Sequence, residues 1–193
     1  MPHVRLSQQP EADALLSSDP LALLIGMLLD QQVPMERAFA APRALADRLG
    51  VERLSAAQIA DADADELVTV FTAPPALHRF PGAMAARVQF MCRALVDYYG
   101  GDPELLWQEA ETGAELLRRL RNLPGFGAQK ASIFLALLGK QYDVQPPGWR
   151  EAAGAYGDED ALRSVADVTG PETLAAVREY KRQAKAAAKA DQS

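Results

Sequence analysis

Two glycines one residue apart mark the stretch of this chain with the clearest potential for chemistry. Gly125 and Gly127 lie in residues 123–131, Leu-Pro-Gly-Phe-Gly-Ala-Gln-Lys-Ala, after a run rich in leucine and arginine and before an apolar run. This order predicts a helix, a tight hairpin and a second helix, because glycine adopts positive φ and allows close backbone approach. The start of the second helix would then stabilise an anion, such as a nucleic-acid phosphate. The alternative is a glycine-capped turn without a ligand.

Basic side chains gather in the same part of the chain. The net charge of the whole chain is −6, which argues against non-specific coating of DNA. Residues 116–150 nevertheless contain six basic side chains and one acidic one, whereas residues 51–70 contain five acidic side chains and one basic one. A phosphate-binding face requires positive charge of this kind around the hairpin. The alternative is a charged face that is only solvated.

Several stretches together resemble one known superfamily. Residues 27–33, Met-Leu-Leu-Asp-Gln-Gln-Val, are similar to a Ser-Gln-Gln segment at the end of a buried helix in the HhH-GPD superfamily of base-excision DNA glycosylases. Residues 77–87 resemble the start of its long central helix, and residues 123–131 resemble its hairpin. The superfamily includes endonuclease III and the adenine-mismatch glycosylases. The resemblance implies an all-α, two-lobed HhH-GPD fold with a DNA cleft between the lobes.

The resemblance assigns DNA-binding roles to residues of two motifs. In the superfamily a glutamine after the buried helix enters the DNA stack when the target base is flipped out, and Gln31 and Gln32 stand at the matching positions. The alternative for this pair is a polar helix end that faces water. The hairpin would hold a phosphate through Gly125, Gly127 and Lys130.

The chain departs from the superfamily at the residue that forms a covalent intermediate. Bifunctional members carry a lysine two residues after the second hairpin glycine, and this position is Gln129 here. Because an amide cannot be that nucleophile, we expect Gln129 to contact DNA without cutting the strand. Lys130 stands one position later, about 100° around the helix, and we expect it to face a phosphate.

A second departure concerns the carboxylate that supports base release. Counted from Val144, the usual aspartate position is Gln145, and an amide neither takes a proton from water nor balances a developing positive charge. Asp143 lies two residues earlier, and Asp30, beside the two glutamines, is the other candidate for this role. The alternatives are that Asp30 is an ion-pair partner or a cap, and that the chain binds DNA without excising a base.

Two aromatic side chains and a set of backbone carbonyls complete the predicted site. Tyr142 and Trp149 flank the loop at residues 143–148, and they are candidates for stacking on the flipped base or for packing in the core. The resemblance also implies a structural monovalent cation, K⁺ or Na⁺, held by the backbone carbonyls of Arg121, Leu123 and Phe126.

Cysteine usage limits the cofactors. Cys92 is the only cysteine, so neither an intrachain disulfide nor an iron–sulfur cluster held by four thiolates can form. The chain would therefore be a cluster-free relative of endonuclease III, and we expect no other cofactor. Cys92 lies in an apolar helical stretch and is expected in the core. His3 and His78 provide no metal-ligand spacing.

The pattern of apolar residues and helix-ending residues predicts helices almost throughout. Asp19-Pro20 begins a buried helix over residues 21–29, a second helix runs from about Met35 to Leu49, and a long helix runs from Pro81 to Tyr98 or Tyr99. The arms of the hairpin motif are residues 113–122 and 128–139. Further helices are predicted near residues 55 and 63, over 104–107 and 159–165, and from 171 to about 190, with a frayed tail over 186–193.

Length and composition indicate one ordinary globular domain. The 193 residues, 49% hydrophobic and 24% charged, suit a single domain over residues 1–193. No apolar run approaches a membrane span of about 18 residues, and the start lacks the layout of a secretory signal. We therefore expect a cytoplasmic monomer without membrane contact, associated with the nucleoid when it binds double-stranded DNA.

The sequence thus favours base-excision DNA repair. The expected activity is binding and base flipping, followed by monofunctional hydrolysis of the N-glycosidic bond of a damaged or mismatched base. The alternative from another class is a non-catalytic lesion sensor on the same fold, and the weakest alternative is a helical adaptor that binds protein.

Overall fold

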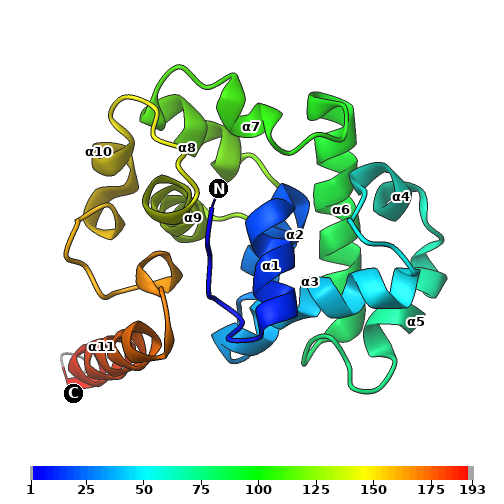
Figure 1. The fold of residues 1–193 in the computed structure, drawn as a ribbon, viewed down its shortest axis with the longest axis horizontal. Helices are drawn as coiled ribbons and strands as arrows, with labels where there is room; N and C mark the ends of the chain where they lie inside the picture. The colour runs from blue at the N-terminus through cyan, green and yellow to red at the C-terminus, as the bar shows by residue number, and fades with distance from the viewer. Residues whose placement is uncertain (1, 191–193) are drawn as a thin grey trace.

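The structure, a computed structural model, describes residues 2–190, and within that range it contains helices and no strand (Figure 1). The all-α prediction is therefore confirmed. The helices in chain order are α1 (Pro10–Ser18), α2 (Pro20–Leu29), α3 (Met35–Leu49), α4 (Ala56–Asp61), α5 (Ala64–Thr72), α6 (Pro81–Tyr99), α7 (Leu105–Gln108), α8 (Gly113–Arg121), α9 (Ala128–Gln141), α10 (Trp149–Ala153), the short 3₁₀ helices η1 (Gly154–Tyr156) and η2 (Val165–Asp167), and α11 (Pro171–Ala190).

Local sequence explains where the first helices begin and end. The Asp19 carboxylate accepts hydrogen bonds from the N–H groups of Leu21 and Ala22, and Pro20 occupies the first turn of α2, where no N–H is needed. Helix α3 ends at Gly50, whose φ of 67° is left-handed. The bounds predicted for α3 and α6 agree with the structure.

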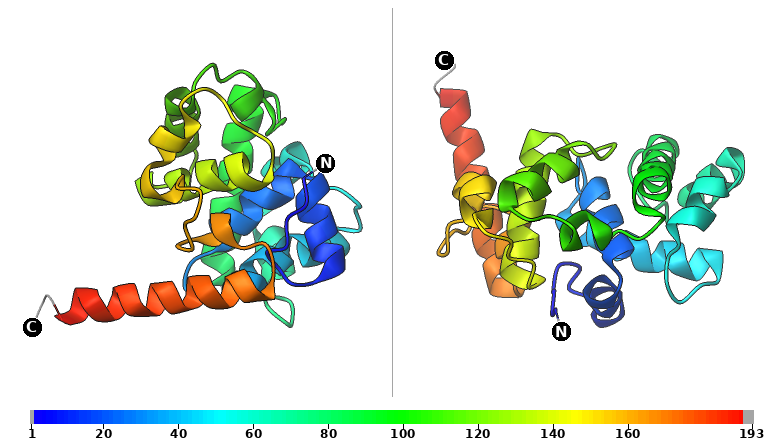
Figure 2. Two further views of the ribbon diagram at one scale, coloured as in Figure 1. Left: turned by 60° about the vertical axis from the view of Figure 1, so that its left-hand side comes forward. Right: turned by 90° about the horizontal axis from the view of Figure 1, so that it is seen from above.

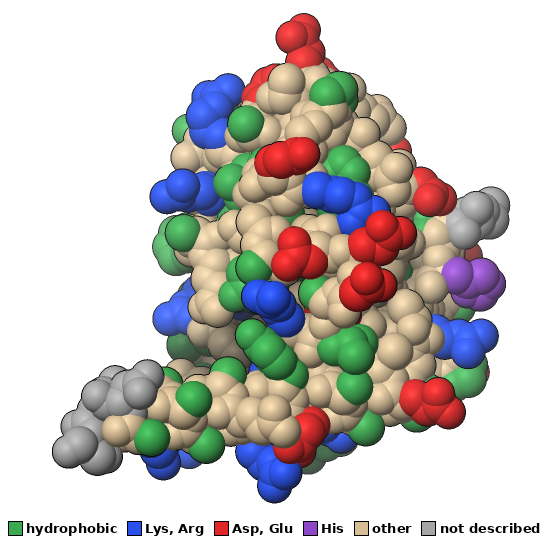
Figure 3. All heavy atoms as spheres, turned by 90° about the vertical axis from the view of Figure 1, so that its left-hand side faces the viewer, with side chains coloured by type: hydrophobic (Ala, Val, Ile, Leu, Met, Phe, Trp, Pro, Cys, Tyr) green, Lys and Arg blue, Asp and Glu red, His purple; other side chains and the backbone are tan. Residues whose placement is uncertain are grey.

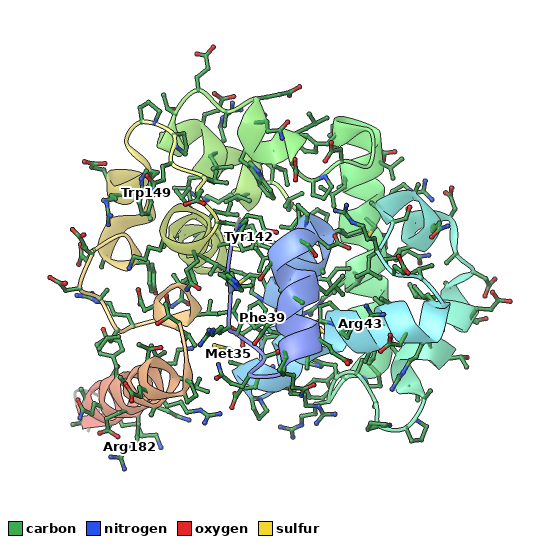
Figure 4. The ribbon with its side chains drawn as sticks, in the orientation of Figure 1. Met35, Phe39, Arg43, Tyr142, Trp149 and Arg182 are labelled. Carbon is green, nitrogen blue, oxygen red and sulfur yellow. The ribbon has the colours of Figure 1, made fainter. Side chains whose placement is uncertain are left out.

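The core is built around α2, in which every residue is buried. Gly26 allows α3 to pack closely, because a Cβ at this position would lie 2.6 Å from the ring of Phe39. Phe39 is completely buried (Figure 4). Cys92 on α6 is also fully buried, as predicted, and burial raises the pKa of its thiol to about 12.

The helices pack in two groups. Helices α1 to α6 pack mainly on one another, and a second group contains α8, α9, α10 and η2, with α11 packed on η2. The two groups lie side by side, with α1 and α2 next to α9 (Figures 1 and 2). They share one hydrophobic core, and Tyr142 at the end of α9 donates a hydrogen bond to the Leu16 carbonyl of α1 at 3.1 Å.

The hairpin prediction is confirmed as a helix, turn and helix. Helix α8 ends at Arg121 and α9 begins at Ala128. Gly125 between them has a φ of 88°, a conformation that a side chain would strain, and a Cβ there would lie 2.9 Å from Leu28 of α2. The hairpin is thus seated against the end of the central helix.

The structure differs from the predicted helices at the start of the chain and between residues 149 and 164. Helix α1 was not predicted, since its short apolar pattern has no polar side chain that caps its start. Residues 159–164 are not helical; the Asp167 carboxylate accepts hydrogen bonds from the N–H groups of Arg163 and Ser164 and holds them in a turn. Helix α11 ends at Ala190, as predicted, and residues 191–193 of the predicted frayed tail lie outside the described range.

Within residues 2–190, no single helix has the length and hydropathy needed to cross a membrane, although α1 and α2, bent by 116° at their junction, pass that test as a pair.

Candidate functional site

An open cavity of about 680 Å³ lies where the hairpin meets the end of α2. Its wall comes from five parts of the chain: the end of α2 with the following loop, the first turns of α9, η1, the segment between η1 and η2, and the middle of α11. The side chains that line it are mostly amides, cations and tyrosines. They include Asp30, Gln31, Gln32, Gln129, Lys130, Tyr156, Arg163, Tyr180 and Lys181.

Lys130 connects the hairpin to the end of α2. Its ammonium group donates hydrogen bonds of 2.9 Å to the carbonyls of Met27 and Leu28, which lie 103 and 102 residues earlier in the chain. These carbonyls belong to the last turn of α2, where the helix dipole favours a positive charge. The ammonium group is therefore held by α2 at the wall of the cavity, and its contact with a phosphate stays a prediction.

Two other side chains donate hydrogen bonds to carbonyls at the same end of α2. Gln31 donates from Nε2 to the Leu28 carbonyl at 2.9 Å. His78 is 1% exposed, and its Nδ1 accepts from the Phe80 N–H, so Nε2 carries the proton and donates to the carbonyls of Leu29 and Gln31. Burial lowers the pKa of His78, which keeps the ring neutral. The end of α2 is thus held rigidly at the cavity.

Asp30 and Lys130 perturb each other at this cavity. Burial raises the pKa of the Asp30 carboxyl, and the ammonium groups of Lys181 and Lys130 only partly oppose this effect. Burial lowers the pKa of Lys130 to about 8, although Asp30 favours its charged form. A carboxylate with a raised pKa is a stronger base than an ordinary aspartate, and such groups gather at functional sites.

The two glutamines differ in their surroundings. Gln31 is fixed from both sides, because its Oε1 also accepts a hydrogen bond of 3.0 Å from Arg87. Gln32 is exposed, and its φ of 57° places it in the left-handed region that few residues other than glycine and asparagine adopt. Gln32 is therefore the member of the pair that projects from the loop at the rim of the cavity.

Gln129 also belongs to the cavity wall. Its Nε2 donates to the Tyr156 hydroxyl at 2.9 Å, which joins the first turn of α9 to η1. No side chain within residues 2–190 caps the start of α9, where Gly127 is the N-cap residue. The first N–H groups of α9 are thus without a side-chain acceptor beside the cavity.

Tyr142 and Trp149 are core residues, which corrects the prediction that they form a base pocket. Tyr142 is 8% exposed, packs edge-on against Trp107 and lies between the two groups of helices (Figure 4). Trp149 is 7% exposed, and its ring covers Gly139, where a Cβ would lie 2.4 Å from the ring. Neither side chain lines the cavity beside the hairpin.

The other two candidates for catalysis lie at the far end of α9. Asp143 is exposed just after the helix, in a left-handed turn with a φ of 57°. Gln145 is exposed as well, and its Nε2 donates to the Gly139 carbonyl at 2.7 Å. Because α9 has 14 residues, it separates these groups from the hairpin by roughly 20 Å. Of the three candidates, the structure brings only Asp30 to the cavity.

The predicted cation ligands are backbone atoms of the hairpin turn. The carbonyl of Leu123 accepts the Phe126 N–H at 3.0 Å, which closes the turn, and the cation remains a prediction. Within residues 2–190 no group of three or more His, Cys, Asp or Glu side chains could hold a metal ion.

Four cavity residues with polar side-chain groups were not predicted from the sequence. Tyr156, Arg163, Tyr180 and Lys181 come from parts of the chain beyond the stretch that resembles the glycosylases. The available signal was the alternation of tyrosine and basic residues in the last third of the chain, but only the fold places these residues opposite the hairpin.

Comparison of the chain with known proteins found no matching family model, no matching curated protein and no matching solved structure.

Proposed function

We propose that the protein binds duplex DNA, receives a flipped base in the cavity beside the hairpin, and hydrolyses the N-glycosidic bond of that base without cutting the strand. One observation carries the proposal. The two motifs that suggested base excision, about 100 residues apart in the chain, meet at one open cavity through the hydrogen bonds of Lys130 to Met27 and Leu28. The two groups of helices around the cavity fit a two-lobed fold of the HhH-GPD type.

The start of α9 fits the phosphate next to the flipped nucleotide. Its uncapped N–H groups and the positive end of the helix dipole favour an anion. Gly125 seats the turn against Leu28, and Gly127 leaves room for the DNA backbone to approach, because a Cβ at Gly127 would point into open space. Gln32, exposed at the rim on a left-handed turn, fills the gap that the flipped base leaves.

Asp30 is the carboxylate that fits the chemistry. It takes a proton from a water molecule as the water oxygen attacks C1′ of the sugar, and the bond from C1′ to the base nitrogen breaks with its electron pair leaving on the base. Its negative charge also balances the positive charge that develops on the sugar. Lys130 positions the end of α2 and is not the nucleophile in this scheme.

The substitution at Gln145 favours a second candidate function, a lesion sensor that binds DNA without excision. This position carries an amide where the superfamily carries an aspartate, and the amide donates a hydrogen bond within the protein.

Base release from duplexes that each carry one lesion distinguishes the two functions. The panel contains uracil, hypoxanthine, alkylated purines, oxidised pyrimidines and 8-oxoguanine mispairs, and alkali reveals any abasic site. We expect release from at least one duplex, with no strand break before alkali. Salt-sensitive binding without release would support the sensor, and the absence of DNA binding would overturn both functions.

A further inference from the structure

The last helix extends well beyond the body of the protein. Helix α11 has 20 residues, but only Leu174 and Val177 in its first half are buried. None of residues 178–190 is buried, and the helix projects past the rest of the chain (Figure 2). Figure 3 shows this projecting part standing away from the body, with Lys and Arg side chains along its lower edge. Packing within the described chain therefore does not explain the second half of the helix.

Basic side chains form a single stripe on this helix, which we call the α11 stripe. It consists of Arg178, Lys181, Arg182, Lys185 and Lys189. At about 100° per residue, these positions fall within roughly 100° of one another around the helix axis. Residues 178–190 carry these five basic side chains and one acidic one, Glu179, in a chain whose net charge is −6. The charge on this helix therefore opposes that of the chain as a whole.

The α11 stripe begins at the candidate site. Lys181 lines the cavity and acts on the pKa of Asp30, and Arg178 forms an ion pair with Glu36 in the first turn of α3. The guanidinium group of Arg163 lies 5.9 Å from the ring of Tyr180. These contacts fix the base of the stripe, and from there it follows the part of α11 that projects from the body (Figure 2). Arg182, in an ion pair with Glu179, points outward from α11 in Figure 4.

We propose that the α11 stripe is a second DNA-binding surface, which follows the phosphate backbone beyond the flipped nucleotide. From Arg178 to Lys189 the helix rises roughly 16 Å, a length over which duplex DNA presents on the order of ten phosphate charges. The inference rests on the proposed function, because it places the same duplex at the cavity and along the stripe. Phosphate contacts of this kind position the duplex and read no sequence.

The composition of the helix favours nucleic acid over an anionic membrane. Helices that lie in a membrane interface need bulky apolar residues opposite their basic face. After Tyr180, residues 181–190 contain alanine as their only apolar residue type. The helix therefore offers charge without a surface that inserts into lipid.

The test compares two full-length double variants with the wild type. Arg182→Gln with Lys185→Gln removes charge from the stripe, and glutamine keeps a good helix propensity. Arg5→Gln with Arg53→Gln removes the same charge elsewhere on the surface. Affinity for a lesion-containing duplex is measured from about 50 to 200 mM salt, the range in which phosphate contacts strongly change affinity, and helix content is checked by circular dichroism.

We expect the stripe variant to bind on the order of tenfold more weakly at the lower salt concentrations, with a salt slope shallower by roughly 2, because each lost phosphate contact removes about 0.9 from the slope. The matched control should keep the wild-type slope. Equal slopes for all three proteins would overturn the inference and leave the proposed function intact. A wild type that binds no DNA would overturn both, and binding of the stripe to phosphatidylglycerol vesicles in place of DNA would overturn the inference in favour of a membrane.

Discussion

The two ends of α9 show how one helix serves two purposes. At its start, Gln129 and Lys130 face an open cavity with Asp30, and burial shifts the pKa values of both charged groups. At its end, Tyr142 is buried against the first helix group, and the ring of Trp149 is pressed on Gly139. The sequence suggested chemistry at both ends. In this helix, an aromatic or polar side chain near a motif can contact a ligand only where the fold leaves space beside it.

The largest expected effect is on stability at the far end of α9. Trp149→Ala should lower the free energy of unfolding by about 3–5 kcal/mol, because it removes a large buried ring from Gly139 and leaves a cavity. Urea unfolding followed by circular dichroism measures the loss. Tyr156→Ala at the cavity end is the matched control and should cost much less, since Tyr156 is only partly buried. Equal costs would contradict the contrast between the two ends.

The next effect is on catalysis at the start of α9. Asp30→Asn should reduce the rate of base release by about 100-fold or more, since a general base or a charge-stabilising carboxylate contributes that much. Asp143→Asn is the control and should stay within about twofold of the wild type, because asparagine tolerates the left-handed turn. Single-turnover release from the duplex identified in the panel provides the measurement. A large loss in Asp143→Asn alone would move the chemistry to the other end of α9.

The pH dependence of stability should report the lowered pKa of Lys130. Because the folded-state pKa of about 8 lies below the ordinary value of 10.5, the unfolded chain binds more protons at Lys130 between these values, and the contribution of Lys130 to stability rises with pH across this window. The raised pKa of the buried Cys92 thiol opposes this rise above about pH 9 in all three proteins. Lys130→Met should lose this rise, whereas Lys185→Met on the exposed part of α11 should keep it. Unfolding midpoints measured between pH 7.5 and 10.5 test this prediction. Parallel curves of midpoint against pH for all three proteins would contradict a partly dehydrated Lys130 ammonium group.

Features that depend on neighbouring residues could be predicted from the sequence, whereas contacts between distant parts of the chain could not. The bounds of α3 follow from Met35 and Gly50, which are local signals, and the prediction for this helix agrees with the structure. The helix predicted over residues 159–165 does not form over 159–164. The carboxylate of Asp167 accepts hydrogen bonds from the N–H groups of Arg163 and Ser164 and holds them in a turn. The contact of Lys130 with α2 spans more than 100 residues, and no local pattern reports it.

Within the site, the sequence predicted which residues take part, but it could not predict where their side chains point. The sequence identified Asp30 and Gln31 as candidates beside the hairpin, and the structure places both at the cavity. It could not show that the ammonium group of Lys130 would donate hydrogen bonds to carbonyls of α2, or that the Tyr142 hydroxyl would donate to the Leu16 carbonyl. Both outcomes depend on how the two groups of helices dock.

The smallest expected effect tests the residue at the usual aspartate position. Gln145 is exposed and makes one hydrogen bond to the Gly139 carbonyl, at the end of α9 opposite the cavity. Gln145→Ala should therefore cost at most about 1 kcal/mol in the free energy of unfolding and leave DNA affinity unchanged. Gln145→Asp should not raise the rate of base release, because its carboxylate would lie roughly 20 Å from the hairpin. An increase in that rate would show that the chain after α9 reaches the cavity when DNA is bound, and the contrast between the two ends of α9 would then hold only for the free protein.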